Sequence, residues 1–345
     1  SSNGKKSKFI LQCLSNIFES FEIVNMNHNL ITDHFTKKIK TENLYSDNKK
    51  WRVPSLIRCH FNNKFVFPFE SDYWRAMKYI EHTLSFNNLE NKKMAYQTGN
   101  GLARFHQICS DLDFTKLVKN IKCFHDTKHY INQFHQIIKD NNLMKLDIKV
   151  YKRVQKLIYC LSNHIVYVEF ILGYLKEKNI DLGVIHGDPK LNNFLFDEKD
   201  KYVVSLIDLD TVSSGYLLTD LADCLRSICN MAGEDPYDIE DVYFDINSCK
   251  HFLKGYFSMP NQKGDYCFEL LPEFIYLIIV ELTIRFLSDF LQSNIYFKVN
   301  YQTQNLYRAE VQYRLLSSFL TQLPILSIVL HEIGISSSQS FVSIQ

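Results

Sequence analysis

Three oxygen-bearing side chains, Asp188, Asn193 and Asp208, carry the strongest chemical signal in this sequence. The first two lie five residues apart in H-G-D-P-K-L-N-N, and the third closes the apolar run S-L-I-D. Transfer of a phosphoryl group from ATP needs a carboxylate that orients the attacking hydroxyl, and oxygen ligands for Mg²⁺. On its own, each of these residues more often stabilises a turn, because Asp and Asn side chains hydrogen-bond to nearby backbone groups. Their conjunction in one short stretch predicts phosphoryl-transfer chemistry.

The residues around this motif predict the scaffold that holds the three side chains together. Residues 183–185 are expected to form a short strand that enters a loop. Residues 194–206 have the pattern of two strands flanking the turn residues D-E-K-D. The loop would place Asp188 and Asn193 on one rim, and the hairpin would return Asp208 to the same place.

Two regions of different composition flank the motif. Residues 1–84 predict an α+β lobe with a strand at 8–14, a helix within 15–40, a turn at Asn62-Asn63, and β-rich patches at 51–60, 63–70 and 74–80. Residues 85–334 predict a mostly helical lobe with helices at 94–109, 127–140, 148–178, 217–231, 239–258 and 268–293. The Ser-rich residues 335–345 are expected to be a disordered tail.

Composition and charge argue against several classes of protein. Lys and Arg number 39 and Asp and Glu 38, so the formal charge of +1 predicts no nucleic-acid partner. Nine cysteines without a C-x-x-C pair predict free thiols in a reducing cytoplasm. The most apolar stretch, 272–287, is interrupted by Glu273, Glu281 and Arg285, so we expect no membrane helix.

The segment H-G-D-P-K-L-N-N-F-L-F-D, followed by L-I-D-L-D-T, resembles the aminoglycoside phosphotransferase and choline kinase superfamily. More narrowly, its D-x-K-x-N-N loop and I-D-L-D-T-V strand end are similar to those of the N-acetylhexosamine 1-kinases. Further segments match in order between residues 9 and 320, among them F-H-D-T-K and T-D-L-A-D-C-L-R. The resemblance implies an α+β, protein-kinase-like, two-lobed fold with an incomplete β-rich N-lobe and a mostly helical C-lobe.

The resemblance also implies roles for the residues of the motif. Asp188 would be the catalytic base, Asn193 and Asp208 would bind Mg²⁺, and Asp210 would be a further acid at the metal. Lys190 would place its ammonium group on the γ-phosphate of ATP; the alternative is a solvated loop lysine.

The same resemblance places ATP between the lobes, beside Gln12, Tyr79 and Ile80. Gln12 stands where a phosphate-pairing Lys is expected, and Met26 stands near the place of that lysine's Glu partner. The sequence also lacks the glycine-rich loop that covers the phosphates in kinases. Two explanations stay open: the sequence is truncated before Ser1, or the lid over the phosphates is supplied otherwise.

Candidate substrate contacts lie in the helical half: His125, Thr127, Asp220, Arg285 and Arg308. Each has a simpler alternative. The F-H-D-T segment and Asp220 are also suited to capping the helices that they begin. An Arg inside an apolar helix must be paired or reach a polar cavity, so Arg285 either holds substrate or pairs with Glu281 or Asp289.

The combined pattern predicts an ATP- and Mg²⁺-dependent sugar kinase that phosphorylates the anomeric hydroxyl of an N-acetylhexosamine. A kinase of another small alcohol, choline-like or aminoglycoside-like, is one alternative, which an acidic pocket would favour. A pseudokinase-like sugar-binding module is the other. The missing Lys, Glu and glycine-rich loop would allow that module, whereas Asp188, Asn193 and Asp208 argue against it.

Overall fold

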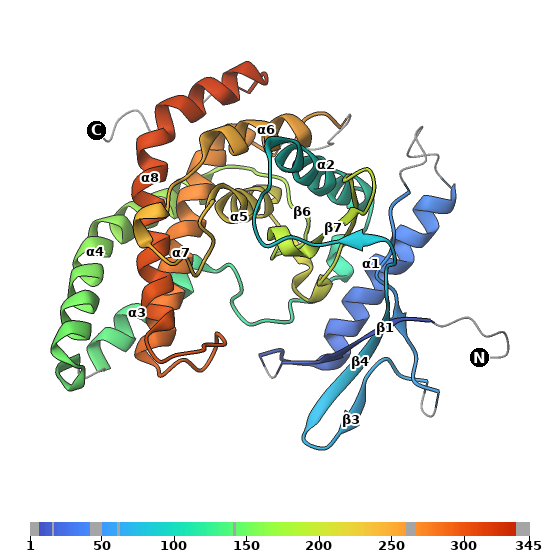
Figure 1. Ribbon diagram of the computed structural model, residues 1–345, viewed down its shortest axis with the longest axis horizontal. Coiled ribbons are helices and arrows are strands. Elements are labelled where there is room, and N and C mark those ends of the chain that lie inside the picture. Colours follow the sequence, from blue (N-terminus) through green and yellow to red (C-terminus); the bar gives the residue numbers. More distant parts are fainter. Residues whose placement is uncertain are drawn as a thin grey trace.

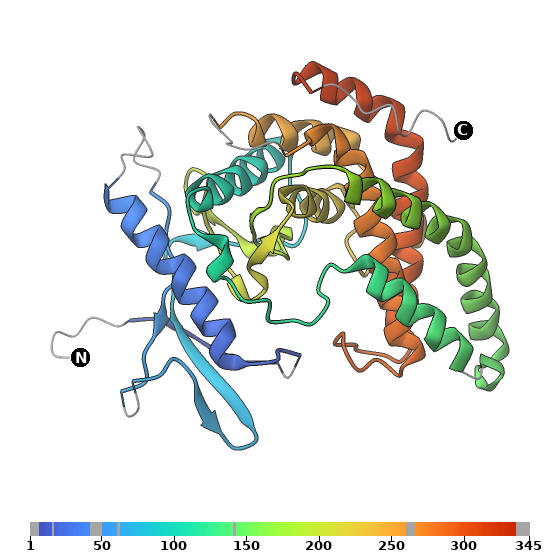
Figure 2. The ribbon, with the colours of Figure 1, turned by 180° about the vertical axis from the view of Figure 1, so that it is seen from behind.

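The computed structural model describes residues 7–15, 17–41, 50–60, 63–140, 143–259 and 266–335. It shows a mixed α+β arrangement, with a small sheet and one long helix beside a larger helical part (Figures 1 and 2). Residue 62 of the expected Asn62-Asn63 turn and residues 336–345 of the expected tail lie outside the described residues.

The small sheet is built around β4 (Asp72–Lys78), to which its other strands pair antiparallel. These are β1 (Phe9–Cys13), β2 (Leu56–Ile57) and β3 (Phe67–Phe69). The predicted first strand is confirmed, and so is the following helix, α1 (Phe21–Thr41). The β-rich patches at 51–60 and 63–70 are shorter as strands than expected, and both pair with β4 rather than with each other.

The expected strand, loop and hairpin of the motif are confirmed. Strand β6 (Gly183–Ile185) pairs with β9 (Ser213–Gly215), and the motif residues lie between these two strands. The hairpin is β7 (Phe194–Asp197) and β8 (Val203–Leu206), and β5 (Thr83–Leu84) adds to its outer edge. A 3₁₀ helix, η4 (Leu209–Thr211), follows β8.

The six predicted helices are present, the one at 127–140 with the predicted ends and the other five with shifted ends. They are α2 (Lys92–Cys109), α3 (Thr127–Asp140), α4 (Ile148–Glu177), α5 (Leu217–Cys229), α6 (Ile246–Tyr256) and α7 (Leu271–Leu291). A further helix, α8 (Gln304–Glu332), had no predicted range. The largest error is at 239–258, because the Asp245 carboxylate caps the backbone N–H groups of Asn247 and Ser248 and the helix begins only there.

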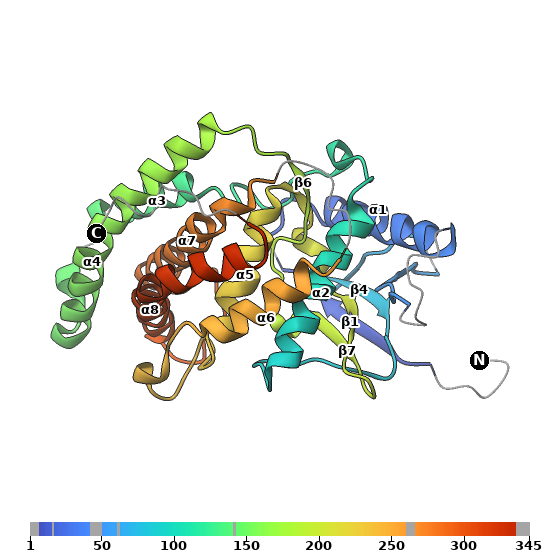
Figure 3. The ribbon, with the colours of Figure 1, turned by 90° about the horizontal axis from the view of Figure 1, so that it is seen from above.

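Helix α7 is the central helix of the hydrophobic core. All of its residues are buried except Arg285, so the apolar stretch at 272–287 is an interior helix that is apolar on every side. Figure 3 shows α7 lying beside α8.

Two other helices, α4 and α8, meet the length and composition of a membrane span, with 28% and 33% of their most apolar windows buried. Core helices of soluble proteins pass the same test, so this is weak evidence for a membrane. The charges within 272–287 bear on α7 alone, and they say nothing of α4 or α8.

Helices α2 and α6 pack with their backbones in close contact through two glycines. A Cβ atom at Gly99 would overlap the carbonyl oxygen of Phe252, and one at Gly255 would overlap that of Tyr96. This approach lets the Tyr256 hydroxyl on α6 reach His106 Nδ1 on α2 at 2.8 Å. His106 supports the loop that carries Asp188, as described below.

We predict that Gly99→Ala lowers the free energy of unfolding by about 2 kcal/mol, because the methyl group forces the two helices apart. Gly173→Ala on α4 is the matched control, since its Cβ meets nothing within 4 Å. That change should instead raise stability by about 0.5–1 kcal/mol, as Ala is the better helix former. Urea unfolding measures both; a Gly99→Ala protein as stable as Gly173→Ala would contradict the proposed helix contact.

Candidate active site

The loop between β6 and β7, which carries Asp188, is held to the helical core by the fully buried carboxylate of Asp220. This carboxylate accepts hydrogen bonds from the backbone N–H groups of His186 (2.6 Å) and Gly187 (2.8 Å), and pairs with His106 Nε2 (2.9 Å). Burial alone would raise the pKa of Asp220, but its bonds to His106 and His186 outweigh burial and hold the pKa below its ordinary value.

Gly187 and His186 shape the loop itself. Gly187 has a φ of +85°, and a Cβ there would lie 2.7 Å from the carbonyl oxygen of Thr211, so only glycine fits without strain. The buried His186 ring bonds the carbonyl oxygen of Ile207 at 2.9 Å, and the carbonyl of His186 accepts from the Thr211 hydroxyl at 2.8 Å. His186 therefore supports the loop.

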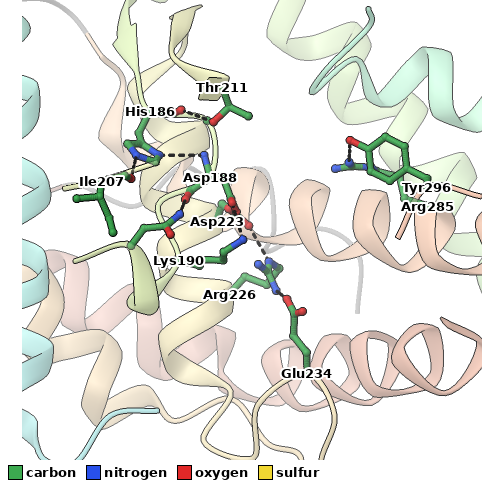
Figure 4. Close-up of polar contacts among 12 residues, drawn as sticks. His186, Asp188, Lys190, Ile207, Thr211, Asp223, Arg226, Glu234, Arg285 and Tyr296 are labelled. Carbon is green, nitrogen blue, oxygen red and sulfur yellow. Dashed lines mark hydrogen bonds and ion pairs between the residues drawn. The ribbon is translucent and has the colours of Figure 1, made fainter. Parts of the chain in front are cut away.

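Asp188 lies in this loop, and Figure 4 shows Lys190 beside it. Asn193 follows Lys190 by three residues. Lys190 Nζ is 2.7 Å from the Asp188 carboxylate, and the Asn193 side-chain nitrogen donates to the Asp188 carbonyl at 2.8 Å. Burial raises the pKa of Asp188 above its ordinary value, although Lys190 opposes the shift. For Lys190, burial would lower the pKa, but Asp188 raises it further, so the ammonium stays charged.

Asp208 and Asp210 follow β8 but have different surroundings. Asp208 is in the left-handed region, with a φ of 64°, and no hydrogen bond or ion pair joins its carboxylate to another described residue. Desolvation, and then repulsion from Asp210, raise the pKa of Asp208. Asp210 is buried and forms an ion pair with Arg75 Nη2 at 2.5 Å.

A cavity of about 390 Å³, which we call the loop cavity, opens between the loop that carries Asp188 and α7. Its lining includes Asp188, Lys190, Asp208 and Asp210, and also Tyr296, Phe297, Arg285 and Arg308. Phe124 lines it too, with its ring against both Gly187 and Arg285. Figure 4 shows Arg285 and Tyr296 across the space from Asp188 and Lys190.

A second cavity of about 480 Å³, the sheet cavity, lies between the small sheet and the β7–β8 hairpin. Gln12, Tyr79 and Ile80 line it from the sheet side, and Asn193 and Asp208 from the other. The three residues expected at ATP are therefore brought together. Asp208 lines both cavities and marks the place where they adjoin.

The expected substrate residues divide into two groups. His125, Arg285 and Arg308 line the loop cavity, whereas Thr127 and Asp220 do not. The Thr127 hydroxyl donates to Glu281 at 2.6 Å, and Asp220 lies in the core beneath the loop. Asp220 is not a helix cap, because α5 begins three residues earlier, at Leu217. Asp126 does cap α3, through the backbone N–H of His129 at 3.0 Å.

The side chains at the far wall of the loop cavity are fixed by one another. Arg285 Nη1 lies 3.7 Å from Glu281, and the guanidinium is surrounded at 4.9–5.6 Å by four aromatic rings, those of Phe124, Tyr130, Tyr296 and Phe297. Burial would lower the pKa of His125, but Glu281 raises it above its ordinary value. Arg308 forms two bonds to the Asp235 carboxylate, at 2.9 and 2.7 Å.

The spacing of Asp220, Asp223 and Arg226 predicts one helical stripe that braces the site, or a cap with a surface salt bridge. Asp223 and Arg226, 2.7 Å apart on α5, line the loop cavity with Glu234. No role is predicted for Arg75, which lies behind the cavities, although a charged residue in the middle of an otherwise aromatic and apolar strand is a signal for a buried ion pair.

The donor set fits a hard divalent cation. Asp208 offers a carboxylate that no described residue engages, and Asn193 offers its side-chain oxygen because its nitrogen is bonded to Asp188. Asp210 is close enough to affect Asp208 electrostatically but is neutralised by Arg75. Among the described residues, no group of three or more His, Cys, Asp or Glu side chains forms a metal site by itself. The proposed ligands are therefore the Asp208 carboxylate and the Asn193 amide oxygen.

Solved structures resemble this chain over most of its length. An aminoglycoside phosphotransferase from Alicyclobacillus acidocaldarius subsp. acidocaldarius DSM 446 is 13% identical, with a TM-score of 0.59 over 94% of this chain and 88% of that chain. Amicoumacin kinase hAmiN, solved with AMP-PNP, Ca²⁺ and Ami, is 15% identical, with a TM-score of 0.54 over 90% of this chain and 83% of that chain. A microcompartment-associated aminopropanol kinase is 12% identical, with a TM-score of 0.52 over 92% and 87%.

At these identities the likeness shows the fold, and it confirms the predicted α+β, kinase-like class. The model of one protein family, the phosphotransferase enzyme family (APH), matches residues 60–246. This match spans more than half of the 345-residue chain and includes both the loop that carries Asp188 and the turn at Asp208. The chain therefore belongs to the phosphotransferase enzyme family.

Proposed function

We propose that this phosphotransferase uses ATP and Mg²⁺ to phosphorylate the anomeric hydroxyl of an N-acetylhexosamine, giving the 1-phosphate. The observation that carries the proposal is the position of Asp208, which lines both the sheet cavity and the loop cavity. A phosphoryl donor in one cavity and an alcohol in the other would meet at this carboxylate.

The donor side of the proposal rests on the sheet cavity. Its apolar lining includes Ile10, Leu11, Met77, Ile80 and Leu195, which suits a flat adenine ring. Its polar end is formed by Gln12, Asn193 and Asp208, which suits phosphates and a divalent cation. The solved complex of amicoumacin kinase hAmiN with AMP-PNP and Ca²⁺ is consistent with this use of the fold.

The chemistry would be direct transfer with positioned groups. Asp188 accepts the proton of the attacking hydroxyl, and Lys190, held at 2.7 Å from it, places a positive charge beside the transferred phosphoryl group. Bound at Asp208 and Asn193, Mg²⁺ would neutralise negative charge on the phosphates. The backbone N–H groups of His186 and Gly187 donate to the Asp220 carboxylate and so hold the loop in one conformation. The loop therefore needs little further ordering during the reaction.

The acceptor side rests on the balance of charge and aromatic surface in the loop cavity. Arg226 is paired with Asp223 and Glu234, and Arg308 with Asp235. Among the residues that the structure describes, these pairs leave no cluster of free carboxylates around Arg226 or Arg308 for a polycationic aminoglycoside. The rings of Phe124, Tyr296 and Phe297, together with the donors of Arg285, suit a neutral sugar with one apolar face.

The proposed location of the protein is the cytoplasm. All nine cysteines are free, which is the state expected in a reducing compartment such as the cytoplasm. The partners would be ATP and a small sugar.

We predict that Asp188→Asn lowers kcat about 10²- to 10⁴-fold, because the base is lost while the shape is kept. The dissociation constant of Mg·ATP should change little, since Asp188 does not line the sheet cavity. Asp200→Asn, an exposed change in the β7–β8 turn, is the matched control. Near wild-type kcat in Asp188→Asn would remove Asp188 from the mechanism.

A second substitution, Asp208→Asn, tests the metal role. Asn tolerates the left-handed backbone of this position, so the change removes charge without adding strain. Calorimetry of the wild-type protein should show ATP binding that Mg²⁺ strengthens about tenfold or more, whereas Mg²⁺ should add little to the affinity of Asp208→Asn. Unchanged dependence on Mg²⁺ would assign the cation to Asp210 instead.

The acceptor is tested by a substrate screen with ATP and Mg²⁺. N-acetylglucosamine or N-acetylgalactosamine should yield the 1-phosphate, identified by coupling of the anomeric proton to phosphorus. Choline, aminopropanol and an aminoglycoside are the competing acceptors. Good turnover of one of these with both hexosamines inert would refute the sugar assignment and leave the phosphotransferase assignment standing.

A further inference from the structure

Arg75, in the middle of β4, is the largest fully buried side chain among the described residues. Its Nε and Nη2 atoms both donate to the side-chain oxygen of Gln12, at 3.0 and 2.7 Å, and Nη2 also reaches the Asp210 carboxylate at 2.5 Å. Its Nη1 atom is buried and has no partner among the described residues. A guanidinium keeps its charge when it is buried. The few contacts that Arg75 makes must therefore offset the cost of burying that charge.

The two bonds to Gln12 decide how that amide is oriented. Because its oxygen accepts from Arg75, the part of Gln12 left for other contacts is the NH₂ group, which carries two donors. Gln12 lines the sheet cavity together with Asn193 and Asp208. Arg75 therefore makes Gln12 a hydrogen-bond donor at the polar end of that cavity.

The bond to Asp210 has a separate electrostatic effect. Asp210 repels negative charge at Asp208, whereas Arg75 attracts it. Pairing with Arg75 thus offsets a second negative charge where the two cavities adjoin. Asp208 is then the carboxylate that remains available for a cation.

Helix α1 offers no acid to Arg75. Met26, which the resemblance placed near the position of a Glu, is 47% exposed. The charge of Arg75 affects a different residue of α1, the buried His28. Its Nε2 lies 2.6 Å from the carbonyl oxygen of Pro54. Burial, and then the charge of Arg75, lower the pKa of His28 to about 4, so the ring is neutral.

We propose that Arg75 is a positioning residue for the nucleotide phosphates: it turns the NH₂ group of Gln12 toward them and neutralises Asp210. The inference rests on the proposed use of ATP and does not depend on which alcohol is the acceptor. In this proposal the neutral amide of Gln12 contacts the phosphates, and the buried guanidinium of Arg75 sets the orientation of that amide.

The sharpest test is Gln12→Glu, which keeps the shape of the side chain and its bonds to Arg75. The new carboxylate would form an ion pair with Arg75, so the ligand-free protein should resist urea at least as well as the wild type. It also replaces the two donors with a negative charge, so the dissociation constant of AMP-PNP with Mg²⁺ should rise tenfold or more. Adenosine, which lacks phosphates, should bind within twofold of wild type.

Arg75→Met and the double variant Arg75→Met/Asp210→Asn test the same contact from its other end. The single variant should weaken AMP-PNP binding about tenfold, spare adenosine, and lower resistance to urea because Asp210 is left buried and unpaired. The double variant should recover most of the lost stability but not the AMP-PNP affinity, since Gln12 is still free to turn. Arg52→Met is the matched control, because Arg52 forms an ion pair with Asp197 at 3.0 Å and lines neither cavity.

Three outcomes would overturn the proposal: Gln12→Glu binding AMP-PNP as tightly as wild type, equal losses for adenosine and AMP-PNP, or a wild-type protein that binds no AMP-PNP. Calorimetry without any acceptor gives these results. A failed sugar screen alongside the expected binding pattern would therefore refute the sugar assignment alone.

Discussion

The buried carboxylate of Asp220 is the contact on which the active site depends. It bonds the backbone of His186 and Gly187 directly, and His106 links it through Tyr256 to α6. A buried charge is costly unless it is fully satisfied, so removing one of these partners would leave the carboxylate uncompensated. The position of Asp188 is thus coupled to the packing of α2 against α6, at the pair of glycines that permits close approach.

A second buried charge, Arg75, links the small sheet to the turn after β8. Its ion pair with Asp210 joins β4 to η4, while Asp220 joins α5 to the loop that carries Asp188. The two arrangements fix the turn at Asp208 and the loop at Asp188 from opposite sides. The sheet cavity and the loop cavity then adjoin at Asp208, which is the geometry that a direct transfer between two bound molecules requires.

The sequence was most informative where the chemistry is local. The loop and hairpin at 183–212 form a contiguous pattern, and their strands were found close to the expected positions. Contacts between distant segments were not predictable: Arg75 with Asp210 spans 135 residues, and His106 with Asp220 spans 114. Asp220 has the residue type of a cap or a substrate ligand, and only the fold shows that two backbone N–H groups face it. For α1, a shift of two residues along the helix separates exposed Met26 from buried His28.

The central claim is that one carboxylate, Asp208, stands between a nucleotide in the sheet cavity and an alcohol in the loop cavity. A crystal structure of the protein with AMP-PNP, Mg²⁺ and N-acetylglucosamine tests this most directly. The account predicts adenine beside Tyr79 and Ile80, the metal on Asp208 and Asn193, and a sugar hydroxyl at Asp188. A nucleotide bound outside the sheet cavity, or a metal that does not touch Asp208, would contradict it.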